Sequence, residues 1–504
     1  MNNKLISMGI VGLLATAGVL GYLYTAIMYA QATDVSGIIY DGSGGPWTVG
    51  GSPYIVTGDV MVPSGETLTI EPGVLVKFDG HYSIYVEGDL DAVGLDTSRI
   101  TITSNMIAPT KEDWNRIQIN SSGHAEIKFA DISYSKYGLH LLSSYNNITN
   151  IEISDNWKYG IYLSSSSNNK LTNNNISNIG APFMGGDAYG IYLGSSSYNN
   201  ITQNNISNNG DPFLGGYSFG LYLISSTNNN ISNNVFTLNR NFGNRLDSSP
   251  DNYISSNNFS YNFNGLFVDS SYNNNVLYNV FFYNSMVGIF LGSSMNINIT
   301  NNDFYRDGVC MYGEDLSYYD SHTIPTNNIV NEKPLYYHKN KSGLNIDGIP
   351  VGQLILVNCT DTDVKNLQID NGDEALHVVY STNINITDNN FMGNYYGINI
   401  FSCQNHDLIE NSISNTNNFG MQLRQSSYIN VTDNVVTNSW SYHGIYLYTS
   451  SDNNIKGNNV SNSGNSGIRL YMSSNNKIIV NNVGNNMWGI NLFQSSNNKI
   501  YHNN

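Results

Sequence analysis

Residues 160–178 read Gly-Ile-Tyr-Leu-Ser-Ser-Ser-Ser-Asn-Asn-Lys-Leu-Thr-Asn-Asn-Asn-Ile-Ser-Asn. Within this stretch the apolar residues Ile161, Leu163, Leu171 and Ile176 alternate with polar residues over short runs. Such alternation is typical of β-strands and does not fit the 3.6-residue period of a helix. Serine and asparagine, which favour turns, fill the intervals between the runs. The stretch therefore predicts three short strands joined by turns.

The same pattern recurs along the chain at a nearly constant spacing. Each copy has the form Gly-apolar-x-apolar or a close variant of it, and the copies begin at Gly138, Gly160, Gly190, Gly220, Gly243, Gly265, Gly288, Ala375 (in place of glycine), Gly397, Gly420, Gly444, Gly467 and Gly489. The series is interrupted between Gly288 and Ala375. Elsewhere two intervals are longer than the others, from Gly160 to Gly190 and from Gly190 to Gly220. Three strands in one such repeat describe one coil of a parallel β-helix, whose strands pair with their equivalents in the next coil about 4.8 Å away.

The composition points the same way. Asparagine accounts for 82 of the 504 residues, and only 12% of the residues are charged. Asparagine side chains at equivalent turn positions of successive coils can stack into amide ladders, which satisfy buried backbone groups without charge. Charged residues at those positions would repel their copies in the next coil. A low charge content is therefore expected of this fold.

The net charge and the cysteines exclude several functions. The formal net charge is −17, from 21 Lys plus Arg against 38 Asp plus Glu. A chain this acidic is repelled by nucleic acid and by anionic lipid, so we expect neither as a partner. The three cysteines are too few for a disulfide framework and form no CxxC spacing. Cys359 and Cys403 lie two coils apart, beyond disulfide reach, and are expected to be buried thiols.

The N-terminus predicts a targeting segment. Residues 5–30 are uncharged and largely apolar, and Ala30-Gln31-Ala32 presents the small residues of a cleavage site, so that Thr33 begins the mature chain. The apolar run is also long enough to span a bilayer. Residues 1–32 are therefore either a signal peptide or an N-terminal anchor, and membrane contact is expected only through residues 5–30 if they are uncleaved. Both alternatives predict an extracellular or cell-surface location.

Composition and spacing divide the rest of the chain. The two longer intervals reflect related insertions, each of which contains Pro-Phe and Gly-Gly. These insertions either form a paired wall of a groove or are a duplicated neutral loop. The expected parts are an N-terminal cap with opening coils at 33–114, repeats at 115–302 with loop insertions near 180–189 and 210–219, irregular coils or an insertion at 303–350, and further repeats at 351–504.

The repeat, in the form Gly-Ile-x-Leu-x-x-Ser-x-x-Asn-x-Ile-x-x-Asn, resembles that of NosD-like proteins of archaeal and bacterial surfaces. The segments that begin Lys333-Pro-Leu-Tyr-Tyr and Gly352-Gln-Leu-Ile-Leu are similar to a recurring segment of that family. The resemblance covers about residues 115–504. It implies an all-β fold, a right-handed single-stranded parallel β-helix (a solenoid). The repeat spacing gives about 22–23 residues per coil. The name NosD implies copper delivery in the periplasm, but no Cys, His and Met cluster is visible, so neither a metal nor another cofactor is expected.

Aromatic residues recur two positions after the repeat glycine, between inward-facing aliphatic residues. Alternation points their side chains outward. A row of exposed rings could stack on sugar rings, whereas rings that stack on one another would only stabilise adjacent coils. The candidate ligand-binding residues are Tyr162, Tyr192, Tyr222, Phe267, Phe290 and Tyr446.

One segment suggests catalysis. Asp370-Asn-Gly-Asp-Glu-Ala-Leu-His-Val is faintly similar to the paired-acid segment of polygalacturonases, which makes Asp373, Glu374 and His377 weak catalytic candidates. Adjacent strand residues point to opposite faces, and glycoside hydrolysis needs two carboxyl groups that flank one bond. We therefore expect Asp373 and Glu374 to be solvated acids of a turn.

Three functions remain open. The favoured hypothesis is an extracellular surface protein with a binding or structural role in the cell envelope, carbohydrate-related and non-catalytic, whose partner is a surface polysaccharide or glycan. The alternatives are a polysaccharide-active hydrolase, lyase or epimerase, and a NosD-like periplasmic accessory protein of a copper enzyme. The last residues stop within a repeat, and an uncovered coil invites strand pairing. End-to-end self-association, or contact with another envelope protein, is expected there.

Overall fold

The computed structural model describes residues 32–39, 45–180, 186–210 and 216–504. The predicted leader, residues 1–32, lies outside this part of the chain except for its last residue. Residues 181–185 and 211–215 of the two predicted insertions also lie outside it. Among the described helices, none has the length and apolar character needed to cross a membrane.

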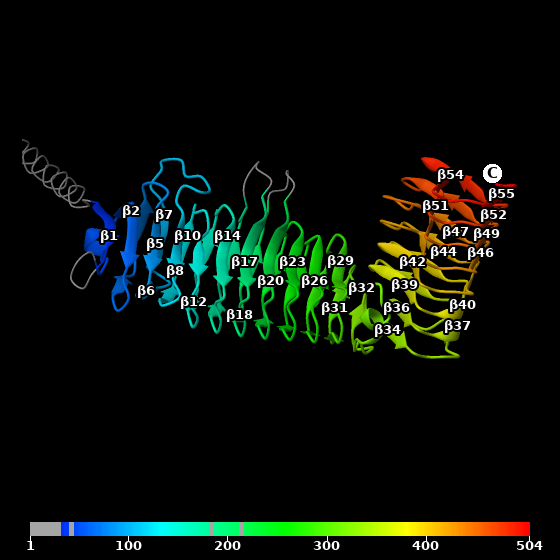
Figure 1. The fold of residues 1–504 in the computed structure, drawn as a ribbon, viewed down its shortest axis with the longest axis horizontal. Coiled ribbons are helices and arrows are strands. Elements are labelled where there is room, and N and C mark those ends of the chain that lie inside the picture. The colour runs from blue at the N-terminus through cyan, green and yellow to red at the C-terminus, as the bar shows by residue number, and fades with distance from the viewer. Residues whose placement is uncertain (1–31, 40–44, 181–185, 211–215) are drawn as a thin grey trace, which may run out of the picture. The chain divides into compact units, whose positions relative to one another are not determined.

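Unit 1, Met1–Ala188, is built from coils of short parallel strands (Figure 1). Two successive coils consist of β11 (Leu139–Leu141), β12 (Asn147–Thr149) and β13 (Glu152–Ser154), followed by β14 (Tyr159–Ser164), β15 (Lys170–Thr172) and β16 (Asn175–Ser177). Ile161, Leu163, Leu171 and Ile176 are fully buried, and each pairs with an apolar residue one coil earlier. The prediction of an all-β parallel solenoid is therefore confirmed.

The first described strands of unit 1 join the same ladder. Strand β1 (Thr33–Ile38) pairs in parallel with β2 (Tyr54–Val62), which pairs in turn with β4 (Leu75–Phe78) and β5 (Ser83–Val86). The rings of Phe78 and Trp114 stack with their centroids 4.1 Å apart, and both side chains are fully buried. These two rings thus fill part of the interior of unit 1.

Unit 2, Tyr189–Asn504, contains two stacks of coils. The first stack extends from β18 (Asn200–Thr202) to β33 (Ile329–Val330), and the second from β34 (Lys333–Lys339) to β55 (Lys499–Tyr501). A short helix, α2 (Ser317–Asp320), lies between β32 (Val309–Tyr312) and β33. Strands β33 and β34 pair antiparallel, whereas β33 pairs in parallel with β31 (Asp303–Tyr305) and β34 with β36 (Gln353–Val357). Strand direction therefore reverses between the two stacks.

Asparagine ladders satisfy the turns, as the composition predicts. In one ladder of unit 2, each backbone N–H donates to the Oδ1 of the next member, at N···O distances of 2.8–3.0 Å. Each side-chain amide also donates to the next one. The members are Asn204, Asn234, Asn257, Asn279, Asn302 and Asn328. Other asparagines, such as Asn173 and Asn178 at φ +55°, take the left-handed bends that end strands.

The repeat glycine is required by the approach of the next coil. A Cβ at Gly265, in β26 (Asn264–Asp269), would lie 2.7 Å from the carbonyl oxygen of Gly288 and 2.9 Å from the Phe281 ring. We therefore expect Gly265→Ala to destabilise the protein by about 1–3 kcal/mol, because a packed strand must move to admit the methyl group. Thermal unfolding followed by circular dichroism measures the loss.

The matched control for this substitution is Gly484→Ala, in β53 (Asn482–Gly484). A Cβ at Gly484 meets no atom within 4 Å, so this variant should unfold at the wild-type temperature. Equal melting temperatures for the two variants would show that the stacked glycines tolerate a side chain, contrary to this explanation of the repeat.

Candidate functional site

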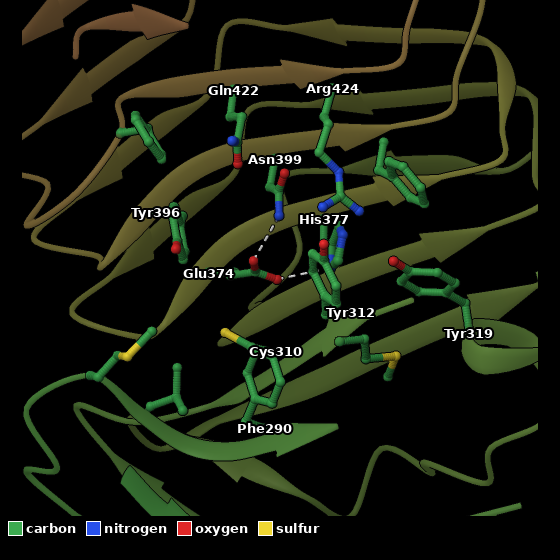
Figure 2. A pocket seen from close by; sticks show the side chains of 15 residues that line it. Phe290, Cys310, Tyr312, Tyr319, Glu374, His377, Tyr396, Asn399, Gln422 and Arg424 are labelled. Carbon is green, nitrogen blue, oxygen red and sulfur yellow. Dashed lines mark hydrogen bonds and ion pairs between the residues drawn. The ribbon is translucent and has the colours of Figure 1, made fainter. Parts of the chain in front are cut away.

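A cavity of about 180 Å³ lies in unit 2 where the two stacks meet. Figure 2 shows its lining, which comes from both stacks. The first stack and its helix contribute Phe290 of β29 (Val287–Gly292), Cys310 and Tyr312 of β32, and Tyr319 of α2. The second stack contributes Glu374 and His377 of β39 (Glu374–Val379), Tyr396 and Asn399 of β42 (Tyr396–Phe401), and Gln422 and Arg424 of β45 (Met421–Arg424).

Strand β39 is buried along its whole length. Leu376 and Val378 join the hydrophobic core of the second stack, as alternation predicts. His377 lies between them in sequence and faces the other way, where helix α2 covers it. The Tyr319 ring of α2 meets the His377 ring edge-on, with centroids 6.0 Å apart. A face that a solenoid strand usually exposes to water is thereby closed over.

Glu374 is the carboxylate at the centre of the site. Asn399 Nδ2 donates a hydrogen bond to Glu374 Oε1 at 2.9 Å. His377 Nδ1 lies 2.9 Å from Glu374 Oε2, an ion-pair distance that lacks standard hydrogen-bond geometry. The side chains of Glu374 and His377 are only 3% and 1% exposed. Figure 2 shows Glu374 between the two groups, with one dashed line to Asn399 and another toward His377.

The expectation that Asp373 and Glu374 are solvated turn acids is wrong. They are 1% and 2% exposed, because the first stack packs against the start of β39. They do point to different environments, as adjacent positions predict. Asp373 Oδ2 accepts a hydrogen bond from the Gly288 N–H at 2.8 Å, whereas Glu374 faces the cavity. The structure therefore brings Glu374 and His377 together and directs Asp373 away from them.

Arg424 brings a cation to the cavity. Its guanidinium carbon lies 4.0 Å from the centroid of the Phe401 ring and 4.5 Å from that of Tyr312. Stacking on aromatic faces holds a guanidinium group in place without an acid. No carboxylate of the described residues lies within 4.0 Å of its nitrogens. This positive charge remains available to a ligand.

Burial favours the neutral forms of Cys310, Tyr319 and Tyr396 in the lining. Burial, together with the charges of Glu374 and Asp373, raises the pKa of the Cys310 thiol well above its usual range. Burial likewise raises the pKa of Tyr319 and of Tyr396. Cys310 is therefore a buried thiol rather than a reactive thiolate.

Asp307 and Asp373 are two interacting buried acids that do not line this cavity. Asp307 is fully buried and accepts hydrogen bonds from the backbone N–H and the Nδ2 of Asn284, at 3.1 Å and 2.9 Å. Burial raises the pKa of Asp307 to about 8. Burial, and then the charge of Asp307, raises the pKa of Asp373 well above its usual range. At neutral pH the protonated form of each carboxyl group is therefore favoured.

The predicted aromatic residues do not form one continuous exposed strip. All six are half-buried, and several stack on one another, as Phe267 does on Phe290 with centroids 4.5 Å apart. Arg245 takes the equivalent position between Tyr222 and Phe267. Tyr162 and Tyr192 contact the rings of Tyr159 and Tyr189, and Tyr446 belongs to the second stack. Phe290 alone among the six lines the cavity.

Asn399 and Gln422 are absent from the predicted site residues, although the sequence carries a signal for them. The position two residues after the repeat glycine is aromatic in many coils, but it holds His377, Asn399 and Gln422 in three consecutive coils. Strand pairing places these three residues in one column. A run of three polar residues at a position that is aromatic in many other coils could therefore have marked the site. Nothing local marks Tyr312 or Arg424.

The described residues contain neither a disulfide nor a cluster of metal-ligating side chains. Cys310, Cys359 and Cys403 are unpaired and buried, which confirms the expected buried thiols. Cys359 and Cys403 flank Ser381 in a ladder of side chains, since the Cys359 N–H donates to Ser381 Oγ and the Ser381 N–H approaches Cys403 Sγ. Across the described part of the chain, no group of three or more His, Cys, Asp or Glu side chains is placed to hold a metal ion.

Known proteins resemble this chain chiefly in their repeats. A family model described as "Periplasmic copper-binding protein (NosD)" matches residues 326–504, and one described as "Right handed beta helix region" matches residues 82–243 and 183–330. Over 53 residues the chain is 45% identical to protein bark beetle of Drosophila melanogaster, a match that covers 10% of this chain and only 2% of that protein.

Solved structures that are similar to this chain share little sequence with it. The periplasmic alginate epimerase AlgG is 12% identical over 69% of this chain and 77% of that one, with a TM-score of 0.34. The Dettilon tailspike protein is 14% identical over 69% and 61%, with a TM-score of 0.32. The repeat and the stacked parallel coils lead to the same conclusion as the two family matches: the chain is a NosD-like right-handed parallel β-helix repeat protein.

Proposed function

We propose that the protein binds a saccharide in the cavity of unit 2, outside the cytoplasm and without chemical turnover. The observation that carries this proposal is the pairing of aromatic rings with side-chain amides in one cavity. Phe290 and Tyr312 offer faces on which the C–H groups of a sugar ring can pack, while Asn399 and Gln422 offer amides for its hydroxyl groups. The description of the matched family as periplasmic supports the location.

The amide of Gln422 is the most available of these groups. Its side chain makes no hydrogen bond to any described residue, so its donors and its acceptor can all serve a ligand. Asn399 is partly committed, because its Nδ2 donates to Glu374. Arg424, stacked between Phe401 and Tyr312, adds a cation next to these amides. The lining thus offers apolar, hydrogen-bonding and charged contacts together.

The carboxyl groups argue against glycoside hydrolysis in this cavity. Glycoside hydrolysis uses two carboxyl groups on either side of the scissile bond. Glu374 is the single carboxylate among the described residues that line the cavity, and Asp373 is directed to the Gly288 N–H instead. Glu374 is therefore assigned to holding Asn399 in place rather than to catalysis.

A glycan array followed by calorimetry of the best ligand tests this function. We expect Gln422→Ala and Tyr312→Ala each to weaken binding by about tenfold, the size of one lost hydrogen bond or stacking contact. Asn491→Ala is the matched control, because it removes an amide from the same column of side chains, in β54 (Trp488–Phe493), where it does not line the cavity.

The same ligand is then incubated with the protein and its products are analysed. An intact glycan agrees with the proposal. Cleavage or epimerisation would contradict the non-catalytic part of it, and Glu374→Gln and His377→Ala would then locate the reaction. If no glycan binds, or if all three alanine variants bind equally, the cavity is not a saccharide site.

A further inference from the structure

A second cavity, of about 220 Å³, lies in unit 1 and plays no part in the function proposed above. Three successive coils contribute to it, through residues at or just before β8 (Arg116–Ile119), β11 and β14. Its lining consists of Arg116, Tyr137, His140, Lys158, Tyr159 and Tyr162. Six residues, all cationic, imidazole or phenolic, and none acidic, thus surround one hollow.

The charge of this cavity is opposite to that of the chain. The protein carries a formal net charge of −17, yet neither Arg116 nor Lys158 has a carboxylate of the described residues within 4.0 Å. The nearby Lys136, by contrast, forms an ion pair with Glu112. Two uncompensated cations in an acidic protein create a local attraction for anions.

Two hydrogen-bond donors of the lining also lack an acceptor. Arg116 Nη1 lies 3.1 Å from His140 Nδ1, and because a guanidinium group only donates, Nδ1 accepts and the imidazole proton lies on Nε2. Burial, and then the charge of Arg116, lowers the pKa of His140 to about 4, so that the ring is neutral at pH 7. His140 Nε2 and Arg116 Nε are buried without a partner. Unpaired buried donors are costly, and they mark a place where an acceptor is missing.

The tyrosines supply the apolar part of the cavity. The guanidinium of Arg116 lies 4.5 Å from the centroid of the Tyr137 ring, and Lys158 Nζ lies 5.3 Å from that of Tyr159. The rings of Tyr159 and Tyr162 lie 4.8 Å apart and are tilted against each other. Each cation is therefore held against a ring, and a ligand that contacts the cations also contacts the rings.

We propose that this cavity binds the acidic ring of a saccharide, a sugar that carries a carboxylate or a sulfate group. The oxyanion lies on Arg116 and Lys158, and the sugar ring packs on the tyrosines. A bidentate contact to the guanidinium suits both anions. This site is additional to the saccharide cavity of unit 2 and does not depend on it.

The test uses the full chain with the unit 2 cavity disabled by Gln422→Ala and Tyr312→Ala. Calorimetry compares trigalacturonate with galactotriose, which has the same ring without the carboxylate, and with a galactose oligosaccharide sulfated at O6. We expect at least one acidic ligand to bind at least about tenfold more tightly than galactotriose. Its affinity should fall as sodium chloride is raised from about 50 to about 500 mM.

Substitutions then assign the binding to this cavity. Arg116→Gln should weaken the acidic ligand by at least about tenfold, and Lys158→Gln should weaken it in the same direction without disturbing the contact between Arg116 and Tyr137. Lys170→Gln removes the same charge from an exposed position of β15 and should leave the affinity unchanged. Melting temperatures of all three variants establish that each is folded.

Several results would overturn the proposal. They are equal binding of galactotriose and the acidic ligands, no binding of any acidic ligand, equal affinities for the Lys158→Gln and Lys170→Gln variants, and binding of inorganic sulfate as tight as that of the saccharides. Binding of only the carboxylated or only the sulfated ligand supports the proposal and identifies the oxyanion. Because every sample carries the same weakened unit 2 cavity and the decisive comparisons are between substitutions in unit 1, none of these results bears on the function proposed for that cavity.

Discussion

Replacing Asp307 with asparagine is expected to stabilise the protein at pH 8 and to reduce the dependence of its stability on pH. Asp307 occupies the end of an asparagine ladder whose earlier members are Asn239, Asn262 and Asn284. It is fully buried and accepts two hydrogen bonds from Asn284. An asparagine there keeps an acceptor for Asn284 and, like its predecessors, can donate to a backbone carbonyl. The substitution therefore removes a buried acid without breaking the ladder.

The sign of the pH effect follows from the raised pKa. An aspartate in the unfolded chain has a pKa of about 3.9, whereas burial raises that of Asp307 to about 8 in the folded protein. Between these values the folded protein holds a proton that the unfolded chain lacks, so stability falls as the pH rises. The contribution is complete below about pH 4, falls by up to about 1.4 kcal/mol per pH unit, and is lost above about pH 8.

Melting temperatures at pH 5 and pH 9 measure this effect. The wild-type protein should lose more stability between the two values than Asp307→Asn does. Some dependence should persist in the variant, because burial also raises the pKa of Asp373. Asp303→Asn, which removes an exposed carboxylate from the neighbouring strand β31, should follow the wild-type curve. If Asp307→Asn also follows the wild-type curve, then Asp307 does not hold a buried proton in the folded protein.

Local sequence patterns predict the coil of this protein well. The positions of Ile161, Leu163, Leu171 and Ile176 follow from strand alternation, and their burial follows from stacking one repeat on the next. The amide ladders follow from the asparagine content in the same way. In each case the interacting residues are equivalent positions of neighbouring repeats, so one repeat contains all the information required.

The cavity of unit 2 could not be predicted in this way. It exists because β33 and β34 form an antiparallel hairpin, after which a second stack packs against the exposed end of the first. No repeat encodes that contact. The sequence pattern therefore predicts a solvated acid at Glu374, and no local pattern marks Arg424 as a site residue. Only the polar column of His377, Asn399 and Gln422 departed visibly from the aromatic residues of other coils.

Replacing Gln353 with leucine is expected to loosen the contact between the two stacks. Gln353 is fully buried at the start of β36, and its side-chain amide pairs with the backbone of Val309 in β32. Its Oε1 accepts from the Val309 N–H at 2.9 Å, and its Nε2 donates to the Val309 carbonyl at 2.6 Å. The amide thus serves Val309 as a neighbouring strand would. Leucine has a similar size but leaves both backbone groups unpaired, at about 1–3 kcal/mol each.

Hydrogen exchange locates this loss. In Gln353→Leu we expect faster exchange in β32 and β36, with little change in strands far along the second stack, such as β50 (Asn459–Ser461). Gln368→Leu, in β38 (Gln368–Asp370), makes the same change to leucine at an exposed glutamine. It should leave the exchange of β32 unchanged. Equal protection of β32 in the two variants would contradict the role given to Gln353. Because residues of both stacks line the unit 2 cavity, Gln353→Leu should also weaken saccharide binding there, although Gln353 does not line it.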